Sequence, residues 1–307
     1  MKLQHLQVFI AVAREKSLRA AARSQDLAQP SVTRIIQELE QDLGVTLFNR
    51  SLRGVALTEF GVALQRRASQ ILEDVQRARE ELVQIQGNML GRVTFGATSS
   101  IALTLLPATI KRFRQKAPHA ELVLTEVNFR QSMHRLRDGT LDLIASHVQP
   151  GVIDEEVLQS IPLLDTDFVI MARQGHPLAN ARALSDLLDA EWITPIASDR
   201  SQTSNLTTAY GQAGLPLPRR ITHYTSFAIA LGLLCGTDML GWFSRPLAAR
   251  IAPFGLQQIE VDMPVNALQM SVVIRKNHLL TPVAQYFLEC LQRSAREVAE
   301  SLPPKLS

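Results

Sequence analysis

Two short amphipathic segments between residues 17 and 48 constrain this chain more than any other feature, because only a very short polar break separates them. The first begins with Ser17, a residue type that caps helix N-termini, and carries three consecutive alanines. The second begins at Gln29-Pro30 and has apolar residues at helical spacing: Val32, Ile35, Ile36, Leu39 and Leu43. Pro30 fits only the first turn of a helix, where its missing N–H is not needed.

Small alanines in the first segment would let the second helix cross it closely, as a helix-turn-helix requires. Gln29, Ser31, Thr33 and Arg34 stand at the start of the second helix. Such side chains read base edges in the DNA major groove. The same pattern also fits an ordinary helical hairpin with a solvated face, so the flanking sequence has to decide between the two.

A short hairpin with a basic tip is predicted directly after the second helix, over residues 45–58. Two apolar stretches flank a polar segment that carries Arg50 and Arg53. A hairpin at this place would be the wing of a winged helix-turn-helix, and its arginines would lie over neighbouring phosphates.

At this point the sequence resembles the LysR-type transcriptional regulators, densely over the first sixty residues. Two departures from the family are visible: Ala28 stands where the family usually has Ser, and Gln25 where it has Leu. The family's base-reading Ser is Thr33 here, which keeps the hydroxyl. The resemblance rests on Phe9, Val12, Ala13, Ser17, Ala21, Ala22, Gln29, Pro30, Val32, Ile36, Leu39, Glu40, Leu43, Gly44, Leu47, Phe48, Arg50, Leu57, Thr58 and Gly61.

The resemblance implies an α+β multidomain fold. It consists of an N-terminal winged helix-turn-helix (1–58), a long linker helix (59–91) and a C-terminal two-lobed α/β, periplasmic-binding-protein-like effector domain (92–307). Lobe I would comprise residues 92–163 and 265–302, and lobe II residues 164–264. We expect DNA contacts from Ser17, Arg19, Gln29, Pro30, Ser31, Thr33, Arg34, Arg50 and Arg53.

A long uninterrupted helix is predicted from Thr58 to about Gln86, with a heptad-like apolar seam. So narrow a seam could lie on the helix's own domain, but it favours pairing with a second copy of the chain. The resemblance adds that family members dimerise through this helix and that effector-domain contacts can pair dimers into a homotetramer. The seam comprises Leu64, Ala68, Ile71, Val75, Ala78, Leu82 and Ile85.

From Arg92 onward, predicted strands alternate with predicted helices, which indicates a mostly parallel sheet with helices on its faces. Two such α/β blocks, with the chain crossing between them near Leu163 and near Pro264, would leave a cleft between two lobes. The segments 139–143 and 176–179 also resemble motifs of the family's effector domain.

Polar residues at predicted strand ends and helix starts are the candidate effector contacts. Helix N-termini attract anions, so Ser99 and Ser100 suggest a small organic anion, although these hydroxyls could merely cap the helix. His147 alone would more often be structural. The full set comprises Thr98, Ser99, Ser100, Asn128, Phe129, His147, Ser201, Gln202, Thr203 and Phe227.

Composition and motifs bound the remaining function classes. The chain has 307 residues, a net charge of +3 and 46% hydrophobic residues, ordinary for a globular protein with real cores. No nucleophile elbow, phosphate-binding loop, dinucleotide fingerprint or metal-ligand spacing occurs, so we expect neither an enzyme nor a cofactor or metal. Cys235 and Cys290 are expected to be buried structural thiols.

The expected partners are double-stranded promoter DNA, a small effector and further copies of the chain, with RNA polymerase as another candidate. The chain shows no apolar run long enough for a membrane span and no signal peptide, so we expect a cytoplasmic protein. A solute-binding protein remains an alternative for the two-lobed part, but the DNA-binding head argues against it.

Overall fold

A computed structural model describes residues 1–51, 54–85, 89–149, 151–196, 205–262, 268–276 and 279–302. The chain divides into two compact units. One contains residues 1–88 and 134–141; the other contains residues 89–133 and 142–307. Within the described residues, no helix is both long and apolar enough to cross a bilayer.

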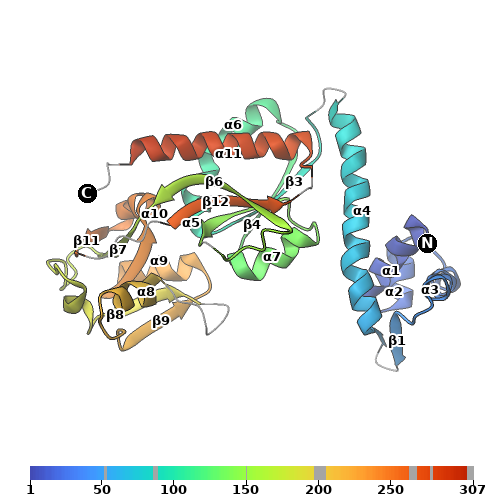
Figure 1. Ribbon diagram of the computed structural model, residues 1–307, viewed down its shortest axis with the longest axis horizontal. Coiled ribbons are helices and arrows are strands. Elements are labelled where there is room, and N and C mark those ends of the chain that lie inside the picture. The colour runs from blue at the N-terminus through green and yellow to red at the C-terminus, as the bar shows by residue number, and fades with distance from the viewer. Residues whose placement is uncertain are drawn as a thin grey trace. The chain divides into compact units, whose positions relative to one another are not determined.

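The first unit begins with three helices (Figure 1): α1 (Leu3–Glu15), α2 (Leu18–Ser24) and α3 (Gln29–Leu43). Their shared core contains Phe9 and Ile36, both fully buried. Ala21, also fully buried, belongs to the same core and has only a methyl side chain, so α3 can pack closely on α2. The structure therefore has the two helices that the alanine run and the apolar spacing predict.

The helix ends follow the sequence signals. The Oγ of Ser17 accepts a hydrogen bond from the backbone N–H of Ala20 (3.3 Å), which caps α2. Helix α3 begins after Ala28 without a side-chain cap, and Pro30 lies in its first turn. Gly44 ends α3 in the left-handed conformation (φ +68°), which glycine adopts without steric cost.

An antiparallel hairpin follows α3, as predicted. It pairs β1 (Phe48–Ser51) with β2 (Gly54–Leu57), in a register that places Phe48 opposite Leu57. Glu40 of α3 fixes the hairpin's approach, because its Oε1 accepts hydrogen bonds from the N–H groups of Leu47 (2.7 Å) and Phe48 (3.3 Å). Residues 52 and 53 lie outside the described part of the chain.

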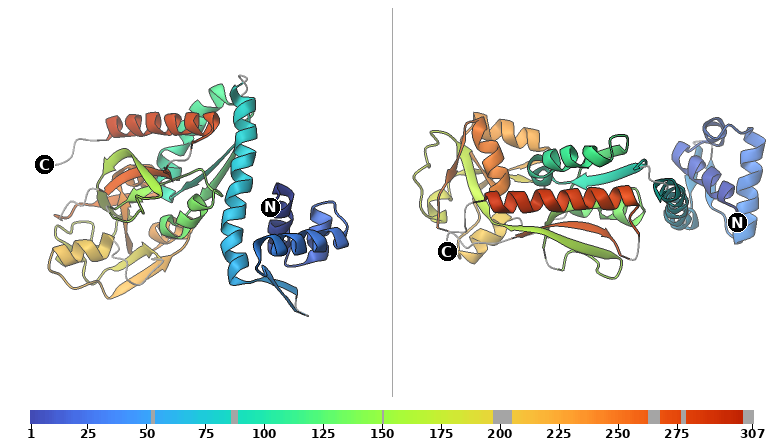
Figure 2. Two further views of the ribbon diagram at one scale, coloured as in Figure 1. Left: turned by 45° about the vertical axis from the view of Figure 1, so that its right-hand side comes forward. Right: turned by 90° about the horizontal axis from the view of Figure 1, so that it is seen from above.

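Helix α4 (Glu59–Ile85) is a single helix of 27 residues, with α1–α3 and the hairpin beside its N-terminal half (Figure 2). The expected seam has two parts. Ala68 is fully buried and Leu64 partly buried against the core of α1–α3, so this part of the seam lies on its own domain. Further along, Ile71 is 39% exposed and Leu82 is 65% exposed, so this part has no such cover.

Two five-stranded sheets form the second unit. The first has the order β4-β3-β5-β12-β6, in which β3 lies parallel to β4 and β5, while β12 is antiparallel to β5 and β6. Its strands are β3 (Arg92–Ala97), β4 (Glu121–Glu126), β5 (Leu143–Val148), β6 (Leu158–Thr166) and β12 (Leu268–Arg275).

The second sheet has the order β11-β7-β10-β8-β9, with parallel pairs β8–β9 and β8–β10 and antiparallel pairs β7–β10 and β7–β11. Its strands are β7 (Phe168–Arg173), β8 (Glu191–Pro195), β9 (Arg220–Tyr224), β10 (Met239–Ser244) and β11 (Leu256–Ile259). Because β6 ends at Thr166 and β7 begins at Phe168, the chain first crosses between the sheets at Asp167.

Helices cover both sheets, and some differ from the expectation. The apolar spacing of the sequence predicts one helix over 103–113, whereas the structure has two helices, α5 and α6, which are separated at Leu105, and Pro107 lies in the first turn of α6. Sequence analysis did not predict four of the elements: strands β6, β9 and β11 and helix α10. The helices are α5 (Ser99–Thr104), α6 (Leu106–Lys116), α7 (Phe129–Arg137), η1 (Leu184–Leu187), α8 (Asn205–Gln212), α9 (Phe227–Gly236), α10 (Arg245–Ile251), η2 (Ala252–Phe254) and α11 (Pro282–Ser301).

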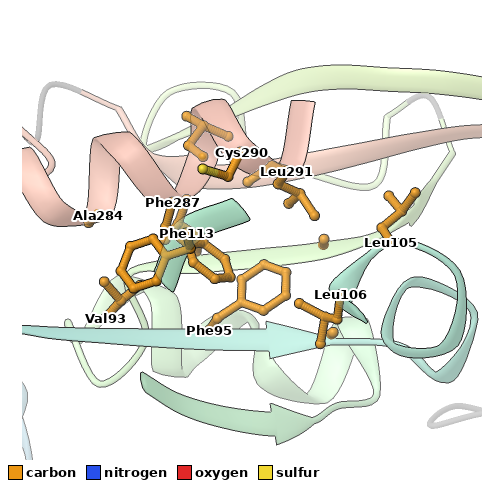
Figure 3. Close-up of a cluster of buried hydrophobic side chains, with 14 of the residues drawn as sticks. Val93, Phe95, Leu105, Leu106, Phe113, Ala284, Phe287, Cys290 and Leu291 are labelled. Atoms are coloured by element: carbon orange, nitrogen blue, oxygen red, sulfur yellow. The ribbon is translucent and has the colours of Figure 1, made fainter. Parts of the chain in front are cut away.

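The core of the first lobe brings α11 onto β3 and α6 (Figure 3). The ring of Phe287 lies 5.1 Å from that of Phe95 and 5.5 Å from that of Phe113, measured between centroids. Cys290 is buried in this core, as expected. Cys235 is exposed, so the expectation of a second buried thiol is wrong: α9 buries Phe227 and Leu234 but leaves its opposite face uncovered.

Candidate functional site

The N-terminus of α3 presents the side chains that sequence analysis selects for reading bases. Gln29, Pro30 and Ser31 are exposed, while Val32 on the opposite face is fully buried. The hydroxyl of Thr33 donates a hydrogen bond to the carbonyl of Gln29 (3.1 Å), so its oxygen remains available as an acceptor. This end of α3 can therefore offer polar groups to a DNA groove without disturbing its core.

Arg34 lies at the same helix end, with 81% of its side chain exposed to solvent. Its Nε donates to Oε1 of Glu38, one turn further along α3, at 2.8 Å. An exposed pair of this spacing is weak, so a guanine edge or a phosphate could displace the carboxylate. Sequence analysis missed Glu38 as the partner of Arg34, although the i,i+4 spacing of opposite charges was a readable signal.

The other predicted DNA contacts surround α3. Ser17 caps α2, and Arg19 is exposed in the first turn of that helix. The exposed Lys16, which sequence analysis missed, sits next to the hairpin: its carbonyl accepts a hydrogen bond from Val55 of β2 at 3.2 Å. Arg50 belongs to β1, and Arg53 lies outside the described residues.

A cavity of about 540 Å³ lies between the two sheets of the second unit. Its lining includes seven of the ten predicted effector contacts, while Ser201, Gln202 and Thr203 lie outside the described residues. The seven are Thr98, Ser99, Ser100, Asn128, Phe129, His147 and Phe227. The volume lies in the usual range for small-molecule pockets. The role of these residues as effector contacts stays a prediction.

The cavity is also lined by residues that sequence analysis did not predict as effector contacts. They include Glu126, Phe168, Trp192, Thr194, Tyr224, Trp242 and Ser244. Trp192 and Trp242 stand on neighbouring strands, β8 and β10, and their ring centroids are 6.0 Å apart. The second lobe thus contributes aromatic side chains to the cavity, and no local sequence motif predicts them.

The serine hydroxyls expected to meet an anion already have protein partners. Ser99 donates to the carboxylate of Glu126, and the Oγ of Ser100 lies 2.7 Å from the Oγ of Ser244, where the two buried residues join the lobes. Helix α5, which these serines begin, has only six residues. An anionic effector at Ser99 would also meet the charge of Glu126.

His147 of β5 lines the cavity with its ring 5.1 Å from that of Phe168, measured between centroids. Burial lowers the pKa of His147 from 6.5 to about 4, so its ring is neutral at physiological pH. Burial, and secondarily the charge of Glu126, raise the pKa of Tyr224 to about 12. Both rings therefore act as neutral hydrogen-bonding groups.

A bidentate ion pair fixes the crossing between the lobes. Arg245 bonds both oxygens of Asp167, with Nε 2.9 Å from Oδ1 and Nη2 2.6 Å from Oδ2. Its backbone N–H also donates to the carbonyl of Asp167 (3.0 Å). Within the described residues, no group of three or more His, Cys, Asp or Glu side chains could hold a metal ion.

Comparison with known proteins identifies the class of this chain. Residues 3–62 match the family described as bacterial regulatory helix-turn-helix protein, lysR family, and residues 86–296 match the LysR substrate binding domain. The chain belongs to the LysR family. It is a LysR-type transcriptional regulator with a helix-turn-helix domain and a substrate-binding effector domain.

Named relatives share this class. The regulator GbpR of Azospirillum brasilense is 30% identical over 259 residues, which cover 83% of this chain and 75% of GbpR. The regulator TdcA of Escherichia coli is 28% identical over 295 residues, covering 94% of this chain and 91% of TdcA. Both are described as HTH-type transcriptional regulators.

Solved structures share the fold. A full-length OxyR from Pseudomonas aeruginosa matches with a TM-score of 0.71 at 22% identity, covering 100% of this chain and 99% of its own. The LysR family regulator CbnR matches with a TM-score of 0.67 at 23% identity, covering 96% and 99% of the two chains. CbnR has also been solved in complex with its target DNA.

Proposed function

We propose that this regulator binds double-stranded promoter DNA through the N-terminus of α3 and the hairpin, and that a small organic effector in the cavity between the lobes changes this binding. The observation that carries the proposal is one chain that combines an exposed, polar start of α3 with a cavity of about 540 Å³ lined from two lobes. A ligand shifts DNA binding only if it prefers one arrangement of the protein over another.

The proposed division of labour follows the expected boundaries: DNA binding by residues 1–58, pairing by 59–91 and effector binding by 92–307. Support for pairing comes from α4, where Ile71 and Leu82 leave apolar surface uncovered beyond the part that packs on the head. Two heads joined in a dimer would bind two half-sites with a raised effective concentration. Contacts between effector domains would pair dimers into a tetramer.

We further propose that the protein acts in the cytoplasm, where promoter DNA and RNA polymerase are found, and that it performs no catalysis. The naming of its relatives as transcriptional regulators supports both statements.

DNA binding is tested with the duplex that the full-length protein selects from a randomised pool. We expect Arg34→Ala to weaken binding to this duplex about 5–150-fold, equivalent to about 1–3 kcal/mol, if Arg34 reads a base edge. Arg53→Ala should weaken binding to selected and random duplexes alike and reduce the salt slope by about one. Arg250→Ala on α10, an exposed arginine of the effector domain, is the matched control and should change neither.

Normal binding of the selected duplex by Arg34→Ala would contradict the assignment of α3 as the base-reading helix. For the effector response, the double variant Ser99→Ala, Thr203→Ala should keep basal DNA binding. If calorimetry showed the effector binding this double variant with unchanged affinity, these two residues would not belong to the effector site.

A further inference from the structure

The carboxylate of Glu38 lies between a buried side chain and an exposed one. Its Oε1 accepts the hydrogen bond from Nε of Arg34 at 2.8 Å, one turn back on α3. Its Oε2 lies 3.8 Å from Nε2 of His5, which is buried where α1 packs on α3. The side chain of Glu38 is 43% exposed, against 81% for Arg34. Glu38 therefore places a partly buried anchor beside an arginine that otherwise extends into solvent.

Glu38 is also the acidic residue of α3 nearest to the helix N-terminus, where the proposed base contacts lie. The two other acids of the helix, Glu40 and Asp42, bond the hairpin backbone and the amino group of Met1. A negative charge beside Arg34 offsets its positive charge, so it weakens the attraction of this helix end for phosphates. Non-specific DNA binding depends on that attraction, whereas the contact with an uncharged base depends on hydrogen-bond geometry. Glu38 therefore lowers the first contribution without removing the second.

The geometry of the pair leaves the outer end of the guanidinium for a base. Glu38 engages Nε, the nitrogen nearest to the backbone of Arg34. Guanine is read by two hydrogen bonds from an arginine to its O6 and N7. The two terminal nitrogens of Arg34 can donate both of these bonds while Nε still donates to Glu38.

The pair also restricts the motion of Arg34 before DNA is bound. A long exposed side chain loses rotamer freedom when it contacts a base, and this loss weakens binding. The hydrogen bond to Glu38 removes part of this freedom in the free protein. The pair is weak in water, but it strengthens when a DNA groove excludes the water around it.

We propose that Glu38 is a positioning residue that makes Arg34 discriminate guanine from other bases, because it holds Nε of the guanidinium and offsets its charge toward phosphates. This inference rests on the proposed function, in which Arg34 reads a base edge.

The test measures base discrimination by full-length protein on the selected duplex and on a set of its derivatives. In each derivative, one G·C pair is replaced by A·T. The pair that depends on Arg34 is the one whose replacement weakens binding by the wild type but not by Arg34→Ala. Discrimination at this pair is a ratio of two Kd values from one preparation, so incomplete folding of a variant does not alter it.

We expect the wild type to discriminate at this pair by about tenfold or more, and Glu38→Ala by about threefold or less. Glu38→Gln should lie between them, because its amide oxygen can still accept from Nε of Arg34. Both variants remove the same charge, so both should steepen the salt dependence of random-duplex binding by about one phosphate equivalent. Glu297→Gln, which takes the carboxylate from Arg112 in the second unit, is the matched control and should change neither quantity.

The Arg34→Ala background shows whether Glu38 acts through the arginine. In that background, Glu38→Ala should change discrimination at no base pair. A loss that persists there would make Glu38 itself a base contact, since a carboxylate can accept from N4 of cytosine, and would overturn the inference. Full discrimination by Glu38→Ala, or equal losses for Glu38→Gln and Glu38→Ala, would overturn it as well.

These results are distinguishable from failure of the proposed function. If no G·C pair depended on Arg34, base reading by this residue would be wrong, and the inference would fail with it. If one pair depended on Arg34 and Glu38→Ala still discriminated fully, base reading would stand and the role of Glu38 alone would be wrong.

Discussion

His147 makes the stability of this protein depend on pH. Burial lowers its pKa from 6.5 to about 4 in the folded protein. The unfolded chain therefore takes up a proton near pH 6.5, while the folded chain resists protonation until about pH 4. Stability rises with pH wherever the unfolded state binds more protons, so it is lost as the pH falls through this window.

The size of the effect follows from the shift. A difference of one pKa unit is worth about 1.4 kcal/mol, so the free energy of unfolding falls by about 3 kcal/mol when the effect is complete. Between pH 8 and pH 5, linkage gives a loss of about 2 kcal/mol. Comparison of the wild type with a variant that lacks this histidine, at the same two pH values, isolates its contribution.

Urea unfolding at pH 8 and pH 5 measures the effect. His147→Gln cannot be protonated and should lose about 2 kcal/mol less than the wild type over this interval. His119→Gln, which replaces an exposed histidine, is the matched control and should behave like the wild type. Equal losses for the wild type and His147→Gln, or a histidine NMR signal of this residue that titrates near pH 6.5, would refute the reasoning.

Four further substitutions test the architecture. Ile71→Glu places a charge on the uncovered part of α4 and should dissociate the dimer in light scattering and weaken operator binding; an intact dimer would count against the seam. Gly61→Ala adds a Cβ that collides with a backbone carbonyl and should destabilise the head by about 1–3 kcal/mol in thermal unfolding. Gly211→Ala, where a Cβ meets open space in α8, should instead be neutral or stabilise by up to about 1 kcal/mol; similar losses for both would contradict this. Asp142→Asn should cost about 1–3 kcal/mol in urea unfolding, because the buried carboxylate accepts from both N (2.7 Å) and Oγ1 (2.8 Å) of Thr94; an unchanged midpoint would show that these bonds are dispensable.

The DNA-binding head was predictable from sequence because its determinants are local. Ser17, Pro30 and Gly44 mark helix ends by backbone chemistry that acts within one turn. The spacing of Val32 and Ile36 predicts which face of α3 is buried, and the other residues of the helix are then predicted to be exposed. The same local logic finds most strands of the effector domain.

Prediction from local sequence patterns fails where the structure of a segment depends on residues from distant parts of the chain. Strands β9 and β11, which lie at the edges of the second sheet, have weak apolar alternation, so pairing with β8 and β7 decides them. The heptad-like seam of α4 could not reveal that Ala68 packs on the head whereas Ile71 does not, because coverage depends on where α1 lies.

The sequence by itself determined the class of this protein, the helix-turn-helix with its hairpin, the long α4 and seven residues that line the cavity. Only the tertiary structure decided what that cavity presents to a ligand. It brings Trp242 of β10 and His147 of β5 into the lining of one cavity, and it occupies the Ser99 hydroxyl with Glu126. The physical reason is that hydrogen-bond satisfaction and pKa depend on three-dimensional neighbours, which the spacing of residues along a chain does not specify.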